Sequence, residues 1–203
     1  MPYPPTPALH VPSPWSVTAL DGTPLRLRLP ADTDVEALTA ICQDPEIQRF
    51  TLVPSPYTAA DAQSYVSAAH SLAESGQGLV LIVVDDRDGQ LLAAIGLDLD
   101  WREATAELGY WAAPGRRGRG VVTAAAASVC RYAFEELDIA RVWLRAAATN
   151  RGSAAVARRL GFTLEGVLRC AGIDGPTGDR RAPRVDMHVW GLLAGELPEQ
   201  LGR

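Results

Sequence analysis

The sequence predicts a single α/β domain with a mixed, mostly antiparallel central sheet, one parallel β-α-β crossover and flanking helices. Short runs of alternating or β-branched apolar residues recur along the chain, and turn sequences separate several of them. A long helical pattern lies between two of these runs, which is typical of a crossover to a parallel strand. With 203 residues, of which 47% are apolar, the chain can bury one substantial core.

The two ends of the chain are predicted to be tails. Residues 1–15 hold six prolines, so we expect an extended N-terminal tail that is dispensable for the fold. The domain is expected to occupy residues 16–193, and residues 194–203 form a C-terminal tail.

A strand and a helix are predicted at the start of the domain. Leu and Arg alternate over residues 25–29, which is the period of a half-buried strand. Capping and acidic residues at 31–34 then begin a helix that ends near Cys42. Residues 44–57 contain three prolines and predict an irregular connection with at most one short helix.

A second helix and a hairpin follow. Thr58 and Asp61 have the spacing of a capping box, for a helix that ends near Glu74. Residues 78–84 and 91–97 are apolar runs joined by an Asp- and Gly-rich turn, which predicts an antiparallel hairpin.

The crossover is predicted in the second half of the chain. Residues 106–111 form a strand that extends the hairpin into a meander of three or four strands with residues 25–29. A long helix over residues 121–137 leads to a strand at 140–146, which the crossover places parallel to the first.

The last predicted elements are a short helix and two strands. The helix covers residues 151–160, and Gly161 closes it at the position where a left-handed backbone is favoured. Residues 162–168 and 184–192 predict strands, and a polar Gly- and Pro-rich loop at 171–183 joins them.

The turn before the long helix is a candidate anion-binding site. Its sequence is Arg117-Gly118-Arg119-Gly120-Val121-Val122-Thr123. The glycines let the backbone approach a ligand closely, and the helix start offers unpaired N–H groups with the positive end of the helix dipole. Arginines at 116, 117 and 119 add full positive charges, so a phosphate-bearing ligand is expected there.

Composition excludes several classes of protein. The net charge of −5 argues against a general nucleic-acid binder. The three cysteines show no metal-ligand spacing, which predicts free thiols and no metal site. The N-terminus does not resemble a signal peptide, so a cytoplasmic location is expected. No apolar run has the length of a membrane span. All 19 basic residues are Arg, so a lysine Schiff base and a Walker-type loop are impossible.

A dinucleotide site is the less favoured interpretation of the same turn. Gly118 and Gly120 match the first two glycines of G-x-G-x-x-G, but Thr123 occupies the third position. The acidic residue expected at the end of the next strand is also missing, because Asp138 falls before that strand.

The residues resemble a known family. Arg117-x-x-Gly120-x-Val122 resembles the acyl-CoA pyrophosphate loop, R/Q-x-x-G-x-G/A, of the GNAT N-acetyltransferases, and residues 106–111 resemble the strand before it. Asn150-x-x-Ser153 with the later Leu-Gly-Phe resembles the motif of the RimJ/RimL-like branch, the ribosomal-protein N-terminal acetyltransferases. The similarity covers about residues 16–193 and implies the GNAT-like acyl-CoA N-acyltransferase fold.

The resemblance implies roles for individual residues. The loop from Arg117 to Thr123 would bind the pyrophosphate through backbone N–H groups, and the backbones of Trp111 and Ala112 would hold the pantetheine arm, where two strands splay apart. The complete set of implied cofactor-binding residues is Trp111, Ala112, Arg117, Gly118, Arg119, Gly120, Val121, Val122, Thr123, Asn150 and Ser153. Val122 replaces the usual Gly or Ala, and it either crowds the phosphates or packs into the core.

Two residues are candidates for the chemistry. Glu107 either helps the incoming amine to lose its proton or is a surface carboxylate on a half-exposed strand. Ser153 either donates a proton to the departing thiolate or contacts pantetheine, and both Ser153 and Asn150 could equally serve in capping the helix that begins at Arg151. Related enzymes commonly use a tyrosine as the acid, and none lies between residues 150 and 170.

The function implied by the resemblance is transfer of an acetyl group from acetyl-CoA to a primary amine, on a protein N-terminus or a small molecule. No nucleic acid or membrane partner is expected, and homodimers occur in the resembled branch. Val122 and the missing tyrosine are the reasons to keep an alternative, a non-catalytic acyl-CoA-binding or sensing module. A third interpretation is a protein-binding domain that uses the Arg cluster on an acidic partner.

Overall fold

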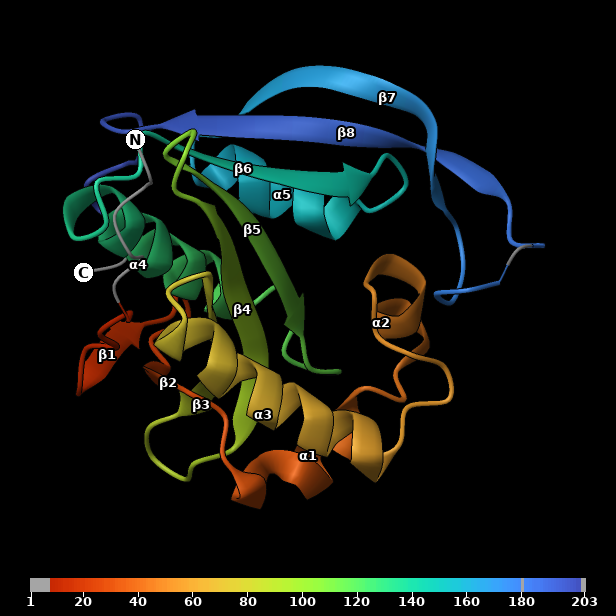
Figure 1. Ribbon diagram of the computed structural model, residues 1–203, viewed down its shortest axis with the longest axis horizontal. Helices are drawn as coiled ribbons and strands as arrows, with labels where there is room; N and C mark the ends of the chain where they lie inside the picture. Colours follow the sequence, from red (N-terminus) through yellow and green to blue (C-terminus); the bar gives the residue numbers. More distant parts are fainter. Residues whose placement is uncertain (1–7, 180, 202–203) are drawn as a thin grey trace.

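One open sheet forms the centre of the molecule (Figure 1). The computed structural model describes residues 8–179 and 181–201. Within these residues, eight strands form a sheet with the order β1-β2-β3-β4-β5-β6-β8-β7. Every neighbouring pair is antiparallel except β5 and β6, which are parallel. The predicted mixed sheet with one parallel crossover is therefore confirmed.

The elements agree closely with the predicted order. The strands are β1 (Trp15–Thr18), β2 (Pro24–Arg28), β3 (Gly78–Asp85), β4 (Leu91–Asp100), β5 (Thr105–Ala112), β6 (Arg141–Ala147), β7 (Thr163–Ile173) and β8 (Arg184–Leu193). The helices are η1 (Asp32–Asp34), α1 (Val35–Ile41), α2 (Pro45–Phe50), α3 (Ala59–Glu74), α4 (Val121–Glu135) and α5 (Arg151–Arg159). The predicted capping box of α3 is present, because Thr58 Oγ1 accepts from Asp61 N and Asp61 Oδ2 accepts from Thr58 N.

Strand β1 was not predicted, because it lies at the end of the proline-rich segment. The side chain of Trp15 is buried in the main core, and its Nε1 donates a hydrogen bond of 2.6 Å to Ser128 Oγ on α4. Further upstream, Leu9 N donates to Ala73 O at the end of α3. Residues 9–18 therefore contact the body of the domain, while residues 1–7 of the predicted tail lie outside the described residues.

Helices cover both faces of the sheet in two separate apolar layers. Helices α4 and α5 pack on one face and belong to the main core, whereas α1 and α3 pack on the other face over β3. Four consecutive alanines, Ala124 to Ala127, are almost fully buried in α4. Because alanine is small, this helix can lie close to the strands beneath it.

The parallel pair β5 and β6 separates along its length. Only Thr105–Glu107 of β5 pair with Arg141–Trp143 of β6, although β5 continues to Ala112 and β6 to Ala147. Figure 1 shows the two strands diverging toward the end of the sheet where α2 lies. The described part of the chain places no strand beside this edge of β5 beyond Glu107, so backbone groups there are free to bind a ligand.

Candidate active site

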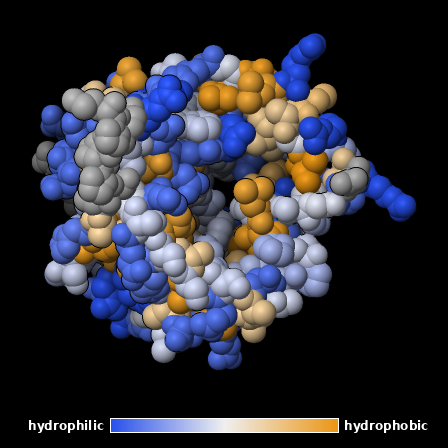
Figure 2. Space-filling view, viewed as in Figure 1, coloured by the Kyte–Doolittle hydropathy of each residue, from blue (hydrophilic) through white to orange (hydrophobic). Residues whose placement is uncertain are grey.

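A large cavity opens where β5 and β6 diverge. Its volume is about 1110 Å³, and its lining comes from α2, α3, β4, β5, the turn before α4, β6 and α5. Figure 2 shows the surface hollowed near the middle of this face. This volume lies slightly above the usual range of about 300–1,000 Å³ for sites of small molecules.

Two glycines leave room for the cavity on the face of the sheet that carries α3. Gly96 of β4 lies directly opposite Gly109 of β5, and both line the cavity. Gly109 is exposed although its strand is central, and a Cβ atom at this position would meet no atom within 4 Å. The absence of side chains at this pair therefore keeps the centre of the sheet open to a ligand.

The turn between β5 and α4 has the backbone geometry of an anion site. Gly118 has a φ of 74°, and Gly120, the N-cap of α4, has a φ of 81°, both in the left-handed region. Gly120 provides no side-chain cap, and the first hydrogen bond within the helix is donated by Ala124 N to Gly120 O. The N–H groups of the first turn therefore remain available to an anionic ligand, assisted by the helix dipole.

The arginines of this turn do not all point to the same place. Arg117 forms ion pairs with Asp44 and Glu46 at the start of α2, and Arg116 donates to Gln90. Arg119 is exposed and is not among the residues that line the cavity. The carboxylates beside Arg117 thus offset part of the positive charge that the sequence led us to expect around an anion.

The remaining predicted residues around the turn lie at the cavity. Trp111 and Ala112 line it from the end of β5, and Val121, Val122 and Thr123 line it from the start of α4. Val122 lies both in the core and at the cavity, so its position fits core packing as well as contact with a bound phosphate. Its side chain is only 8% exposed and belongs to the main core, yet it borders the cavity.

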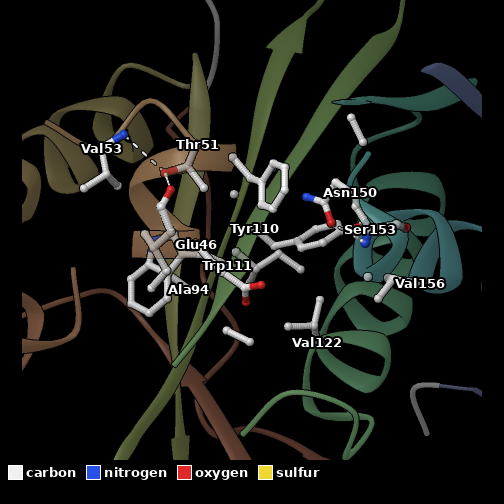
Figure 3. A pocket seen from close by; sticks show the side chains of 18 of the residues that line it. Glu46, Thr51, Val53, Ala94, Tyr110, Trp111, Val122, Asn150, Ser153 and Val156 are labelled. Atoms are coloured by element: carbon white, nitrogen blue, oxygen red, sulfur yellow. Dashed lines mark hydrogen bonds between the residues drawn. The ribbon is translucent and has the colours of Figure 1, made fainter. Parts of the chain in front are cut away.

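A tyrosine completes the site in a place that the sequence did not indicate. The hydroxyl of Tyr110 lies 2.8 Å from Ser153 Oγ, and Figure 3 shows both side chains meeting in the cavity from β5 and α5. Asn150 Oδ1 accepts from Ser153 N at 3.0 Å, which confirms that Asn150 caps α5. Burial raises the pKa of Tyr110 to about 12, although the hydrogen bond with Ser153 acts in the opposite direction. Tyr110 is therefore protonated at neutral pH and can donate a proton.

Sequence reasoning missed Tyr110 because it looked for a tyrosine near residues 150–170. The available signal was strand alternation, which places Tyr110 on the same face of β5 as buried Leu108 and therefore toward α4. Tyr110 and Ser153 are 43 residues apart in the chain, so no local pattern indicates that they are in contact.

Glu107 lies on the other face of β5. Its Oε1 accepts from Arg145 Nε at 3.2 Å, and Glu107 is not among the residues that line the cavity. Asp98, directly opposite Glu107 on β4, does line the cavity. The structure therefore brings Tyr110, Ser153 and Asn150 together at the cavity. Glu107 lies outside the cavity lining, and Asp98 is the neighbouring carboxylate that belongs to it.

The described residues show neither a membrane-spanning helix nor a cluster of metal ligands. None of the helices there combines the length and apolar character needed to cross a membrane. Over residues 8–179 and 181–201, no group of three or more His, Cys, Asp or Glu side chains is arranged to hold a metal ion.

The arrangement suits an extended ligand with an anionic group. Free backbone groups on β5 can pair with the amides of such a ligand, much as an added strand would. The first turn of α4 then receives the anion, and the Tyr110–Ser153 pair lines the same cavity. The residues present thus fit a phosphate-bearing molecule with an amide-containing arm.

Known proteins are similar to this chain in sequence and in fold. Residues 24–163 match the model of the acetyltransferase (GNAT) domain. The protein "Putative ribosomal N-acetyltransferase YdaF" of Bacillus subtilis is 46% identical over 83 residues, a match that covers 40% of this chain and 45% of that relative. In this match the chain spans less than half of the relative's length.

Two solved structures have the same fold. Mycobacterium smegmatis RimJ in complex with CoA-disulfide has a TM-score of 0.77 and 22% identity, covering 91% of this chain and 88% of that one. The microcin C7 self-immunity acetyltransferase MccE, in complex with acetyl-CoA and AMP, has a TM-score of 0.73 and 22% identity, covering 83% of this chain and 92% of that one.

Proposed function

The chain belongs to the acetyltransferase (GNAT) family, and we propose that it transfers an acetyl group from acetyl-CoA to a primary amine. One observation carries this proposal. The open edge of β5, the uncapped start of α4 and the Tyr110–Ser153 pair lie around one cavity, and they suit the arm, the pyrophosphate and the thiol leaving group of acetyl-CoA, respectively.

The residues that would hold acetyl-CoA act mainly through their backbones. The N–H groups from Gly118 to Thr123 would bind the pyrophosphate, and the backbone groups at Trp111 and Ala112 that face the open edge of β5 would pair with the pantetheine amides. Anchoring both parts orients the thioester for attack, which converts an encounter into an intramolecular geometry. An N–H group of the open β5 edge would also stabilise the negative charge that develops on the thioester oxygen.

The proton movements follow from the neighbouring side chains. The amine nitrogen bonds to the thioester carbon, the carbon–sulfur bond breaks, and the departing sulfur takes a proton from Tyr110 or through Ser153. The amine gives up its proton to water or to a carboxylate, for which Asp98 and Glu107 are the candidates. Because Glu107 is paired with Arg145, we favour Asp98 for direct contact with the acceptor.

The acceptor we favour is the α-amine of a protein N-terminus. The relative YdaF carries the name "Putative ribosomal N-acetyltransferase", which supports a protein acceptor. An α-amine with a pKa of about 8 costs only about 1 kcal/mol to deprotonate near pH 7, whereas a lysine at about 10.4 costs roughly 4–5 kcal/mol. A site without a strong, dedicated base therefore favours the α-amine. Such a reaction, and the free cysteines, fit the cytoplasm.

Calorimetry of acetyl-CoA binding tests the cofactor site. We expect the native protein to bind with micromolar affinity, and Gly120→Glu to lose binding by at least about 100-fold, because it places bulk and negative charge in the phosphate loop. A Cβ atom at Gly120 would already lie 2.5 Å from Leu20 side-chain atoms.

Gly89→Glu is the matched control. Gly89 has a φ of 75°, close to that of Gly120, and a Cβ atom there meets nothing within 4 Å. The same backbone penalty should leave acetyl-CoA binding intact. No binding by the native protein would overturn the acetyltransferase proposal. Binding without acetylation of peptides or small amines, followed as release of free thiol, would favour a non-catalytic acyl-CoA-binding module.

A further inference from the structure

One short segment, which we call the strap, lines one side of the cavity. It consists of residues 45–54, that is α2 and the four residues after it. Phe50, Leu52, Val53 and Pro54 line the cavity from the strap, and the side chain of Leu52 is 87% exposed. In Figure 1 the strap stands apart from the other helices, between the end of β5 and the β7–β8 hairpin.

The strap has little packing of its own. Within α2, Ile47 is the only buried residue. Proline residues at 45 and 54 limit regular hydrogen bonding at both ends. The position of the strap must therefore depend on contacts that side chains from other segments make with it.

The turn from Arg117 to Thr123, which we call the phosphate loop, contacts the N-terminal end of the strap. Arg117 reaches from that loop to Asp44 and Glu46, 73 and 71 residues earlier in the chain. Asp44 also caps α2, because its Oδ1 accepts from Glu46 N and Ile47 N. Burial raises the pKa of Asp44, but the hydrogen bonds from Arg117 and from the N–H groups of Ile47 and Glu46 outweigh it and hold the pKa below its usual value.

The β7–β8 hairpin holds the other end. Arg49 pairs with Asp174 through two hydrogen bonds, one of them 2.7 Å from Arg49 Nη2 to Asp174 Oδ2. Thr177 Oγ1 donates to Thr51 O at 3.2 Å. Side chains therefore connect the strap to the turn before α4 through Arg117 and to the β7–β8 hairpin through Arg49 and Thr51.

The sequence predicts that Arg117 binds phosphate, but its contacts with Asp44 and Glu46 indicate another role. A guanidinium that is engaged by two carboxylates contributes little net positive charge to a phosphate, whereas the Arg116 side chain in the same turn donates to the neutral amide of Gln90. The contacts of Arg117 instead connect the cofactor loop to the acceptor wall.

We propose that Arg117 is a positioning residue for the acceptor: it holds the strap, whose apolar side chains receive the group that carries the reacting amine. The inference rests on the proposed function and narrows its acceptor to amines on an apolar group, such as a peptide whose first side chain is apolar. The apolar side chains that the strap adds to the lining support this choice. Of the three carboxylates in the lining, Glu46 is paired with Arg117 and Asp61 caps α3, which leaves Asp98 to accept a proton from the reacting amine.

Hydrogen exchange of the strap amides tests the positioning role without any acceptor. We expect Arg117→Gln and Asp44→Asn each to speed exchange over residues 46–54 by about 3- to 10-fold, the effect of losing partly exposed ion pairs. Asn retains the N-cap of α2, so Asp44→Asn isolates the charge contact. The double variant should exchange no faster than Arg117→Gln alone, because Arg117→Gln already removes the pair with Asp44 together with the pair with Glu46.

Arg116→Gln is the matched control, since it removes the same charge from the same loop. It should leave strap exchange at the native rate. Calorimetry should show that Arg117→Gln weakens acetyl-CoA binding no more than Arg116→Gln does. An unchanged strap together with an acetyl-CoA affinity at least tenfold lower in Arg117→Gln than in Arg116→Gln would show that Arg117 binds phosphate, and would overturn the inference.

Kinetics with two peptides test the acceptor class. The peptides differ only in their first residue, Leu or Asp. We expect the native protein to prefer the Leu peptide by at least about tenfold in kcat/KM, and Arg117→Gln to reduce this preference mainly through a higher KM for the peptide. Equal use of both peptides would overturn the apolar class. Failure of the native protein to acetylate any amine would instead contradict the proposed function, while the exchange experiment would still report on the strap.

Discussion

The two sides of the cavity are built in different ways. On the cofactor side, α4 lies in the main core with almost all of its residues buried, and β5 is fixed to β4 along its whole length. On the acceptor side, α2 has one buried residue and is held by side-chain contacts to distant segments. The thioester needs a fixed geometry, whereas an acceptor must enter and leave, and each wall has the rigidity that its task requires.

Energies of the two kinds of contact explain the difference. Burial of one large apolar side chain stabilises a protein by about 1.5–3 kcal/mol, while an exposed ion pair contributes about 0–1 kcal/mol. Opening the strap therefore costs far less free energy than disturbing α4. Substitutions on the cofactor side should alter chemistry or global stability, and those on the strap should alter local exchange and the KM of the acceptor.

The largest effect is expected from Tyr110, which belongs to the rigid side. Tyr110→Phe removes the hydroxyl next to Ser153, so we expect kcat to fall by about 100-fold while the Kd of acetyl-CoA changes by less than about threefold. Steady-state kinetics and calorimetry measure the two quantities. Tyr132→Phe is the control, because its hydroxyl donates to His10 O, away from the cavity, and its kcat should stay near the native value.

The pH dependence of Tyr110 has a definite sign. Its pKa is raised by burial to about 12, above the ordinary value of 10, so the neutral phenol is retained at every pH below 10. Its contribution to stability is present below pH 10 and is lost as the pH rises toward 12. The pH–rate profile should therefore show no loss of the acid between pH 6 and 9. A falling limb in this range that disappears in Tyr110→Phe would contradict the assignment.

The fold could be predicted from the sequence because its signals are local. Strand alternation, the capping box at Thr58 and the glycine after α5 each act within a few residues, and each predicted element is present. Strand β1 was missed because prolines dominate its surroundings, and its stability comes from Trp15 reaching Ser128, 113 residues later. Tertiary burial outweighed local composition at that point.

The site could be predicted only in part, for the same reason. The turn from Arg117 to Thr123 is a contiguous motif, and the backbone angles of its glycines follow directly from it. The contact of Tyr110 with Ser153 and the pairing of Arg117 with Asp44 depend on how strands and helices come together. No spacing along the chain encodes those contacts, so the sequence placed Arg117 in the site but could not show what it touches.

Val122 gives a smaller effect that separates packing from binding. Because its side chain is 8% exposed and part of the main core, Val122→Ala should lower the free energy of unfolding by about 1–2 kcal/mol, as measured in urea. The Kd of acetyl-CoA should change by less than about threefold. Val167→Ala, at a valine that is 47% exposed, is the control and should change stability by less than about 0.5 kcal/mol. Binding that becomes tenfold tighter in Val122→Ala would show that the valine crowds the phosphates.

The smallest global effect is expected on the strap. Arg49→Gln removes the pair with Asp174, whose side chains are 45% and 18% exposed, and should lower the free energy of unfolding by less than about 1 kcal/mol. Exchange of the amides around Phe50 should nevertheless become faster. Arg26→Gln is the control: it breaks the pair between Arg26 on β2 and Asp86, and Arg26 is 46% exposed, close to the value for Arg49. Because this pair lies away from the strap, strap exchange should stay unchanged.

The pH dependence of the Arg49 effect provides a further check. The hydrogen bond from Arg49 lowers the pKa of Asp174 below its usual value of 3.8. The pair therefore persists above that pH and is lost as the pH falls through the lowered value, where native and Arg49→Gln proteins should exchange alike. If Arg49→Gln instead lowered global stability by more than about 2 kcal/mol, the strap would be part of the cooperative core, and the contrast between the two walls would be wrong.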